Sequence, residues 1–100
     1  MAILNTKVVS GELIGVTSAT QLPDIGCNRV TLKAEQGNAG FVYVGGAGVT
    51  KKSGATDATT GIQLDASEQI TLIISNLNLL WRIADATGDD LTYIAETSGA

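Results

Sequence analysis

Apolar and polar side chains alternate one by one in the segment Asn28-Arg-Val-Thr-Leu-Lys-Ala-Glu35. Val30, Leu32 and Ala34 fall on one face of an extended chain, and charged or hydroxyl side chains fall on the other. Successive side chains of a strand point to opposite sides of its sheet. The alternation therefore predicts a β-strand with one buried and one solvated face, which is typical of antiparallel sheets.

Similar extended segments, separated by turn residues, lie on both sides of this strand. The sequence predicts strands over residues 6–16, 28–35, 41–44, 61–64, 69–75, 79–85 and 91–96. Gly11 is expected to form a bulge or bend, and Gln36–Gly40 a hairpin-type turn. Residues 17–26 and 51–60 are expected to be loops, and no segment has the spacing of a helix. Residues 1–100 are thus predicted to form a single all-β domain, an antiparallel β-sandwich or jelly-roll-like barrel of seven to eight short strands.

Charge and composition exclude several classes of partner. The net charge is -4, and only Lys51 and Lys52 are adjacent among the six basic residues, whereas nucleic-acid binding needs clustered cations. No apolar run approaches the length of a membrane helix. Cys27 is the single cysteine, so no internal disulfide is expected, and the N-terminal residues lack a signal-peptide pattern. We therefore expect no nucleic acid, no membrane, and synthesis in the cytoplasm.

The residues that usually carry out catalysis are sparse. Histidine is absent, which removes the commonest general base and metal ligand. Cys27 is expected to be a small buried residue. The glycines of the run 45–48 lack both the spacing and the following helix of a phosphate-binding loop, so they predict close backbone packing. No cofactor is expected.

The acidic residues give no clear catalytic pair either. Asp85, Asp89 and Asp90 surround a turn and could bind a hard cation, but the expected interpretation is solvated charges at a hairpin. The remaining candidates fall at strand ends or in turns, which predicts no paired-carboxylate site: Glu12, Glu35, Asp65 and Glu68. The chain is therefore predicted to be non-enzymatic, with no catalytic and no metal-ligating residues.

Two apolar features remain. Trp81, with Leu79 and Ile83 on the same face of a predicted strand, is expected to belong to the core rather than to a ligand platform. The apolar residues before the first strand have no obvious core role, so residues 1–5 are predicted to be an arm that docks on a partner, with Ile3 and Leu4 as the partner-binding residues.

From Arg29 onward the order of segments resembles that of a family of small phage virion structural proteins. The matching segments are Arg29-Val-Thr-Leu, Phe41-Val-Tyr-Val-Gly-Gly-Ala-Gly-Val-Thr, Gly61-Ile-Gln-Leu, Glu68-Gln-Ile-Thr-Leu, Leu80-Trp-Arg-Ile-Ala and Leu91-Thr-Tyr-Ile-Ala-Glu. They span about two-thirds of the chain. The loop 51–60 is longer than usual for this pattern, and the N-terminal third carries no shared motif.

The resemblance implies a β-rich decoration, or cement, protein on the outer surface of a bacteriophage capsid. It implies a homotrimer that binds the major capsid protein and stabilises contacts between its subunits. An alternative is a receptor- or glycan-binding module of a phage tail or head fibre. A metal-dependent enzyme, resting only on the acidic turn around Asp89, is a third hypothesis.

Overall fold

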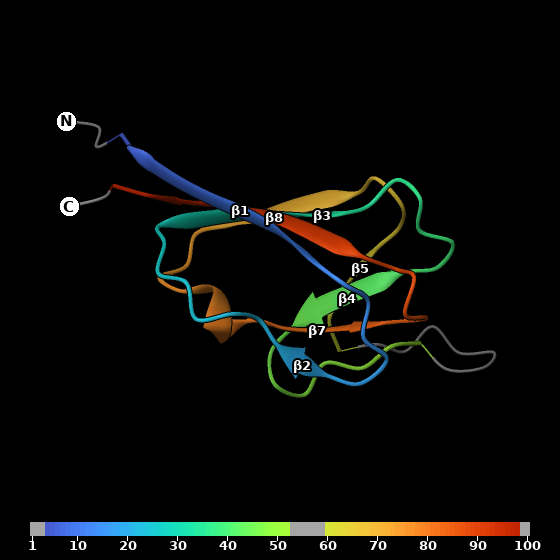
Figure 1. Ribbon diagram of the computed structural model, residues 1–100. Coiled ribbons are helices and arrows are strands. Elements are labelled where there is room, and N and C mark those ends of the chain that lie inside the picture. The colour runs from blue at the N-terminus through green and yellow to red at the C-terminus, as the bar shows by residue number, and fades with distance from the viewer. Residues whose placement is uncertain (1–3, 53–59, 99–100) are drawn as a thin grey trace.

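The computed structural model describes residues 4–52 and 60–98, which form two four-stranded antiparallel sheets that face each other (Figure 1). The first sheet has the strand order β1-β8-β3-β6 and the second the order β2-β7-β4-β5. The bounds of the strands are β1 (Lys7–Leu13), β2 (Thr20–Gln21), β3 (Arg29–Ala34), β4 (Val42–Gly45), β5 (Ile62–Leu64), β6 (Gln69–Leu72), β7 (Trp81–Ala84) and β8 (Leu91–Thr97). The expected all-β sandwich of seven to eight short strands is confirmed, with eight strands in the described residues.

The strands pair in a nested order. β1 pairs with β8, β2 with β7, β3 with β6, and β4 with β5. This is the pairing of one long hairpin rolled over on itself, the arrangement of a jelly roll. Only the β4–β5 connection stays within one sheet, and all the others cross between the sheets. Both ends of the described chain consequently lie at the same end of the sandwich (Figure 1).

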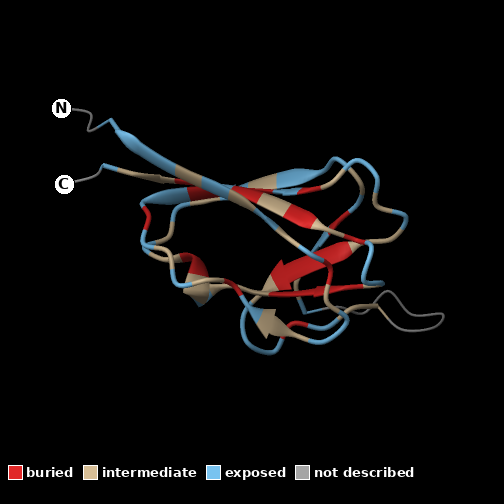
Figure 2. Ribbon diagram, in the orientation of Figure 1, coloured by how far each residue is buried: buried red, intermediate tan, exposed pale blue. Residues whose placement is uncertain are grey.

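The core lies between the two sheets (Figure 2). Val30, Leu32 and Ala34 of β3 are completely buried there, as the alternation of their strand predicts. Val42 and Val44 of β4 face them from the second sheet and belong to the same cluster.

The first strand differs from its prediction in length and regularity. It ends at Leu13, and Gly11 forms no bulge, because it pairs with Tyr93 in an unbroken antiparallel register. The reason for a glycine here is steric: a Cβ at Gly11 would lie 2.7 Å from the Tyr93 hydroxyl oxygen. The tyrosine ring occupies the space that a side chain at position 11 would need.

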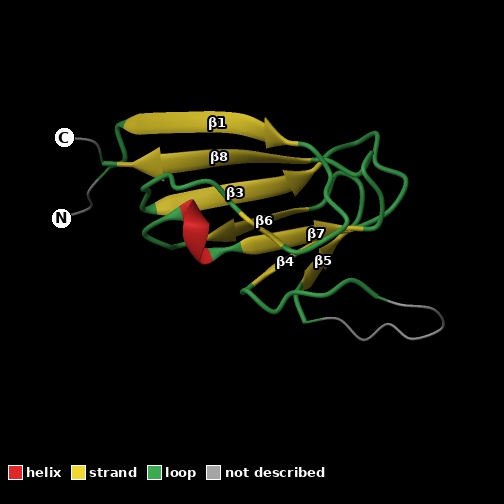
Figure 3. Ribbon diagram, turned by 60° about the horizontal axis from the view of Figure 1, so that its bottom comes forward, coloured by secondary structure: helices red, strands yellow, loops and turns green. Residues whose placement is uncertain are grey.

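Three other predictions are wrong in detail. Residues 36–40 do not form a hairpin, since β3 and β4 belong to different sheets. The expected loop 17–26 contains the short strand β2, which is too brief to show a period. Residues Leu77–Leu79 form one turn of 3-10 helix, capped by the Asn76 side chain, and this turn replaces the start of the predicted strand 79–85 (Figure 3).

Both faces of the second sheet are covered. Ala84 of β7 points into the core between the sheets, whereas Ile83 points outward and packs with Tyr43 and Val49. Trp81 lies partly buried on this outer side, and Leu79 is exposed. The prediction that Trp81 and Ile83 share a face is correct, but that face belongs to a second, smaller cluster. In the described residues no helix is long and apolar enough to cross a membrane.

Candidate functional site

The turn between β7 and β8 organises one end of the sandwich. Asp89 is only 2% exposed. Its Oδ1 accepts hydrogen bonds from the backbone N–H groups of Ala39 (3.1 Å) and Gly40 (2.9 Å), and its Oδ2 accepts one from Ala86 (3.0 Å). The expectation of solvated hairpin charges is therefore wrong for Asp89, because the carboxylate satisfies backbone donors that burial would otherwise leave unpaired.

The two neighbouring aspartates act in the same way. The Asp85 carboxylate accepts hydrogen bonds from the Phe41 backbone N–H and from the Tyr43 hydroxyl, at 3.0 and 3.1 Å. Asp90 Oδ1 accepts one from the Gly15 backbone N–H at 2.8 Å. The three aspartates thus hold the β7–β8 turn against the segments before β2 and β4, which is a structural role.

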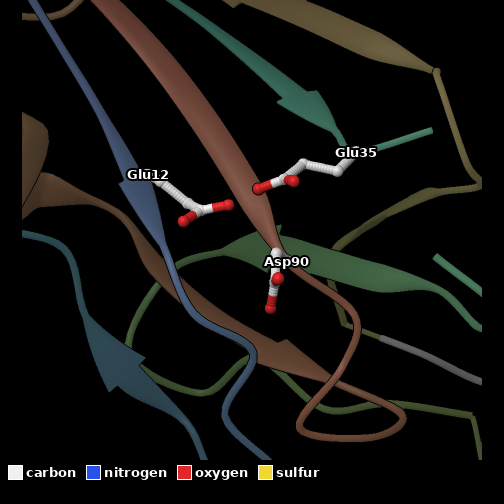
Figure 4. Close-up of side chains that lie close together, drawn as sticks. All are labelled: Glu12, Glu35 and Asp90. Atoms are coloured by element: carbon white, nitrogen blue, oxygen red, sulfur yellow. The ribbon is translucent and has the colours of Figure 1, made fainter. Parts of the chain in front are cut away.

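A second group of carboxylates lies nearby. Glu12 on β1, Glu35 directly after β3 and Asp90 directly before β8 each bring one oxygen within 4.8 Å of the others (Figure 4). They meet because β8 lies between β1 and β3 in the first sheet. The sequence places Glu12 and Glu35 far apart and predicts no pair, so the strand order alone creates this cluster.

Crowding of these carboxylates changes the protonation of Glu35. The pKa of Glu35 is raised to about 7, first by a side-chain hydrogen bond with Glu12, then by burial and by repulsion from Glu12 and Asp90. Glu35 Oε2 is shielded from solvent and has no hydrogen-bond partner among the described residues. Glu12 and Glu35 can therefore share a proton near neutral pH.

Arg82 supplies positive charge beside this group. Its side chain extends from β7, is 8% exposed, and donates from Nη1 to the Ile14 carbonyl oxygen at 2.6 Å. Burial lowers the pKa of Arg82, and the negative charge of Asp90 opposes that effect. A cation at Asp90 would have to compete with this guanidinium. The chemistry that the cluster supports is therefore the sharing of a proton.

The other sequence candidates have structural surroundings. Cys27 is buried, its Sγ donates to the Ile74 carbonyl oxygen at 3.3 Å, and burial raises the pKa of its thiol. Gly45 packs closely, since a Cβ there would lie 3.2 Å from the Gly61 Cα. The prediction of a small buried cysteine is confirmed. Close backbone packing is confirmed for Gly45 but is wrong for Gly46 and Gly48, where a Cβ would meet no atom within 4 Å. Asp65 and Glu68 lie in the exposed turn between β5 and β6.

The predicted docking arm is only partly within the described residues. Leu4 is 78% exposed, and Ile3 lies outside the described residues. Leu4 borders an open hollow of about 510 Å³, whose other lining residues are Asn5, Asn28, Arg29, Ile73 and Glu96. Within it Arg29 Nη2 and Glu96 Oε1 form an ion pair at 2.7 Å. Leu4, at the start of the described residues, therefore lies beside a surface that is both apolar and charged.

Comparison of the chain with protein-family models, with curated proteins and with solved structures finds no match in any of the three.

Proposed function

We propose that this protein is a non-enzymatic phage capsid decoration, or cement, protein that binds the outside of the head and stabilises contacts between major capsid subunits. The observation that carries the proposal is where the family-like segments fall: they occupy the six consecutive strands β3 to β8. The resemblance therefore follows the architecture of a jelly roll, an arrangement that is frequent in viral capsid proteins.

The exposure of Leu4 supports the proposal. Leu4 is 78% exposed, and its burial against a partner would stabilise the complex. Many weak contacts of this kind add up when the chain coats a particle in high copy number. The resemblance further implies three copies in each decoration unit.

Quantitative mass spectrometry of purified particles tests this proposal. We expect the chain in numbers comparable with the major capsid protein, and particles without it should break at a lower temperature until purified protein is added back. A few copies per particle, or unchanged heat resistance without the chain, would contradict the proposal.

A matched pair of variants tests the arm. Leu4→Asp should weaken binding to particles, whereas Leu79→Asp should not, because Leu79 is also exposed but lies outside the arm. Equal binding by both variants and the unaltered chain would show that the arm is dispensable.

The alternative is a receptor- or glycan-binding module, for which jelly rolls are also used. Partly buried Phe41 and Trp81 on the outer side of the second sheet favour it, since aromatic rings combine apolar area with a rigid shape. A reproducible sugar signal on a glycan array that Trp81→Ala abolishes would support this alternative.

A further inference from the structure

The proposed function uses only Leu4 at the edge of the outer face of the first sheet, beside the hollow that Arg29, Ile73 and Glu96 line, and leaves the rest of that face without a role. One side of this sheet packs on the second sheet, and no described segment covers the other (Figure 1). Three exposed large hydrophobic side chains lie on it: Val8 is 62% exposed, Ile94 48% and Ile73 86%. Charged and polar side chains separate Val8 from Ile73, so what this face can contact depends on how the strand registers align these residues.

The strand registers place these side chains in rows across the sheet. Val8 pairs with Glu96, and Glu96 pairs with Arg29. Ile73 follows β6 and lines the same hollow as Arg29. One row therefore runs from an apolar residue through an acidic and a basic residue to a second apolar residue.

This row is complementary to itself. If a second copy is turned about a two-fold axis that runs along the strands between β8 and β3, Val8 faces Ile73 of the other copy and Glu96 faces Arg29. Each row then has an apolar contact at both ends, and in the middle the Arg29–Glu96 ion pair of one copy lies against the same pair of the other with the charges reversed. A two-fold interface requires this kind of self-complementarity.

The neighbouring row is compatible with the same axis. Ser10, Ile94, Thr31 and Thr71 form it, because Ser10 pairs with Ile94, Ile94 with Thr31 and Thr31 with Thr71. Under the two-fold axis, Ile94 faces Thr31 of the other copy and Ser10 faces Thr71. These are small or apolar side chains, which allow two sheets to stack at about 10 Å.

We propose that this face binds the same face of a second copy of the chain, forming a two-fold dimer centred on Arg29 and Glu96. The carboxylates of Glu12, Glu35 and Asp90 lie toward the opposite end of the same sheet. Repulsion between like charges restricts the contact to the end near Arg29. The dimer differs from the three copies that the family resemblance implies.

The direction of the axis has one consequence, which rests on the proposed function. An axis parallel to the strands places Leu4 of both copies at the same end of the dimer. Two arms could then engage one capsid surface together, which strengthens binding without any new contact.

Sedimentation equilibrium of the isolated chain over a range of concentrations tests the dimer without any particle. We expect the mass of two chains at high concentration, and association that weakens as salt rises. The mass of one chain at all concentrations, or of three chains, would overturn the proposal. Either result would leave the proposed capsid role to be decided by the particle experiments.

Matched substitutions locate the interface. Ile73→Lys should weaken association at least about tenfold, whereas Ile62→Lys on β5 should leave it unchanged, since Ile62 is also exposed but belongs to the other sheet. Circular dichroism should show that both variants are folded. A dimer that resists Ile73→Lys would overturn this choice of face.

The charges and the axis have their own tests. Arg29→Glu and Glu96→Arg should each weaken association, and the double variant should restore it. Stacked sheets are too far apart for a disulfide, so a short bis-maleimide should join Val8→Cys to Ile73→Cys between copies of the double variant. If the exchanged charges did not restore association, the predicted geometry would be wrong. It would also be wrong if a chain with Ile62→Cys and Ile73→Cys were cross-linked equally well.

Discussion

Asp89 and Gly40 fit against each other without space for another atom. Asp89 Oδ1 accepts a hydrogen bond from the Gly40 backbone N–H at 2.9 Å, and a Cβ at Gly40 would lie 2.7 Å from Asp89 Oδ2. The same Cβ would lie 2.9 Å from the Asp85 Cβ. The glycine thus allows the backbone to approach two carboxylate side chains that hold the β7–β8 turn.

This contact predicts the cost of changing either residue. Asp89→Ala should lower the free energy of unfolding by about 3 kcal/mol, because it leaves three backbone N–H groups without their acceptor. Gly40→Ala should lower it by roughly 1–3 kcal/mol through overpacking. Urea denaturation measures both values, and Gly37→Ala, where a Cβ meets no atom within 4 Å, is the control for the glycine variant. A stable Asp89→Ala protein would contradict the structural role.

Glu35 should make stability depend on pH near neutrality. Its pKa of about 7 in the folded protein lies above the ordinary value of 4.5, so the folded state binds the proton more tightly than the unfolded state. The resulting contribution to stability is complete below about pH 4.5 and is lost as the pH rises to about 7. Glu35→Gln should remove this part of the pH profile and stabilise the protein above pH 7 relative to the unaltered chain.

Two further variants check the origin of this effect. Glu12→Gln should flatten the same region, since the hydrogen bond and charge of Glu12 raise the pKa of Glu35. Glu68→Gln, in a different turn, should leave the profile in that region unchanged. Identical profiles for the unaltered chain and Glu35→Gln would mean that no proton is shared in this cluster.

Arg82 should be sensitive even to a substitution that preserves its apolar volume. Arg82→Met removes the donor to the Ile14 carbonyl oxygen and the positive charge beside Asp90. Loss of a hydrogen bond from a charged group costs about 1.5–3 kcal/mol, and thermal unfolding should show a corresponding fall. Arg82→Lys keeps the charge, so its thermal stability should lie between that of the unaltered chain and that of Arg82→Met. Full stability of Arg82→Met would show that burial of the guanidinium cancels its interactions.

Gly11 and Tyr93 should be coupled. Gly11→Ala would place a Cβ 2.7 Å from the tyrosine hydroxyl oxygen and should cost roughly 1–3 kcal/mol of stability. The cost should be smaller in a Tyr93→Leu background, where the ring is absent. A double-mutant cycle measures this coupling, and strictly additive effects would indicate that the ring moves aside without strain.

The sequence predicts most accurately the strands that have one solvent-exposed face. In β3 the alternation identifies Val30, Leu32 and Ala34 correctly, because only one side of the strand is buried. In β7 both sides are buried, so alternation shows that Trp81 and Ile83 share a face but not which layer covers it. Arg82 is missed for the same reason, since a charged residue in a strand suggests a solvated position.

The carboxylate cluster lies beyond sequence reasoning for a different reason. Glu12, Glu35 and Asp90 come together only because β8 inserts between β1 and β3, and strand order leaves no trace in local periodicity. The acidic turn is visible in the sequence, but its burial depends on the segments that fold over it. A hairpin alone would leave Asp89 in water.

The nested pairing also governs how the chain is made. β1 emerges from the ribosome early, but its strand partner β8 is synthesised after all the other strands, and Lys7 finally pairs with Thr97. Contacts between such distant residues make folding slow. During translation the N-terminal strand therefore remains unpaired, with its apolar residues open to other nascent chains. The chain is therefore more vulnerable to aggregation during its synthesis than after it has folded.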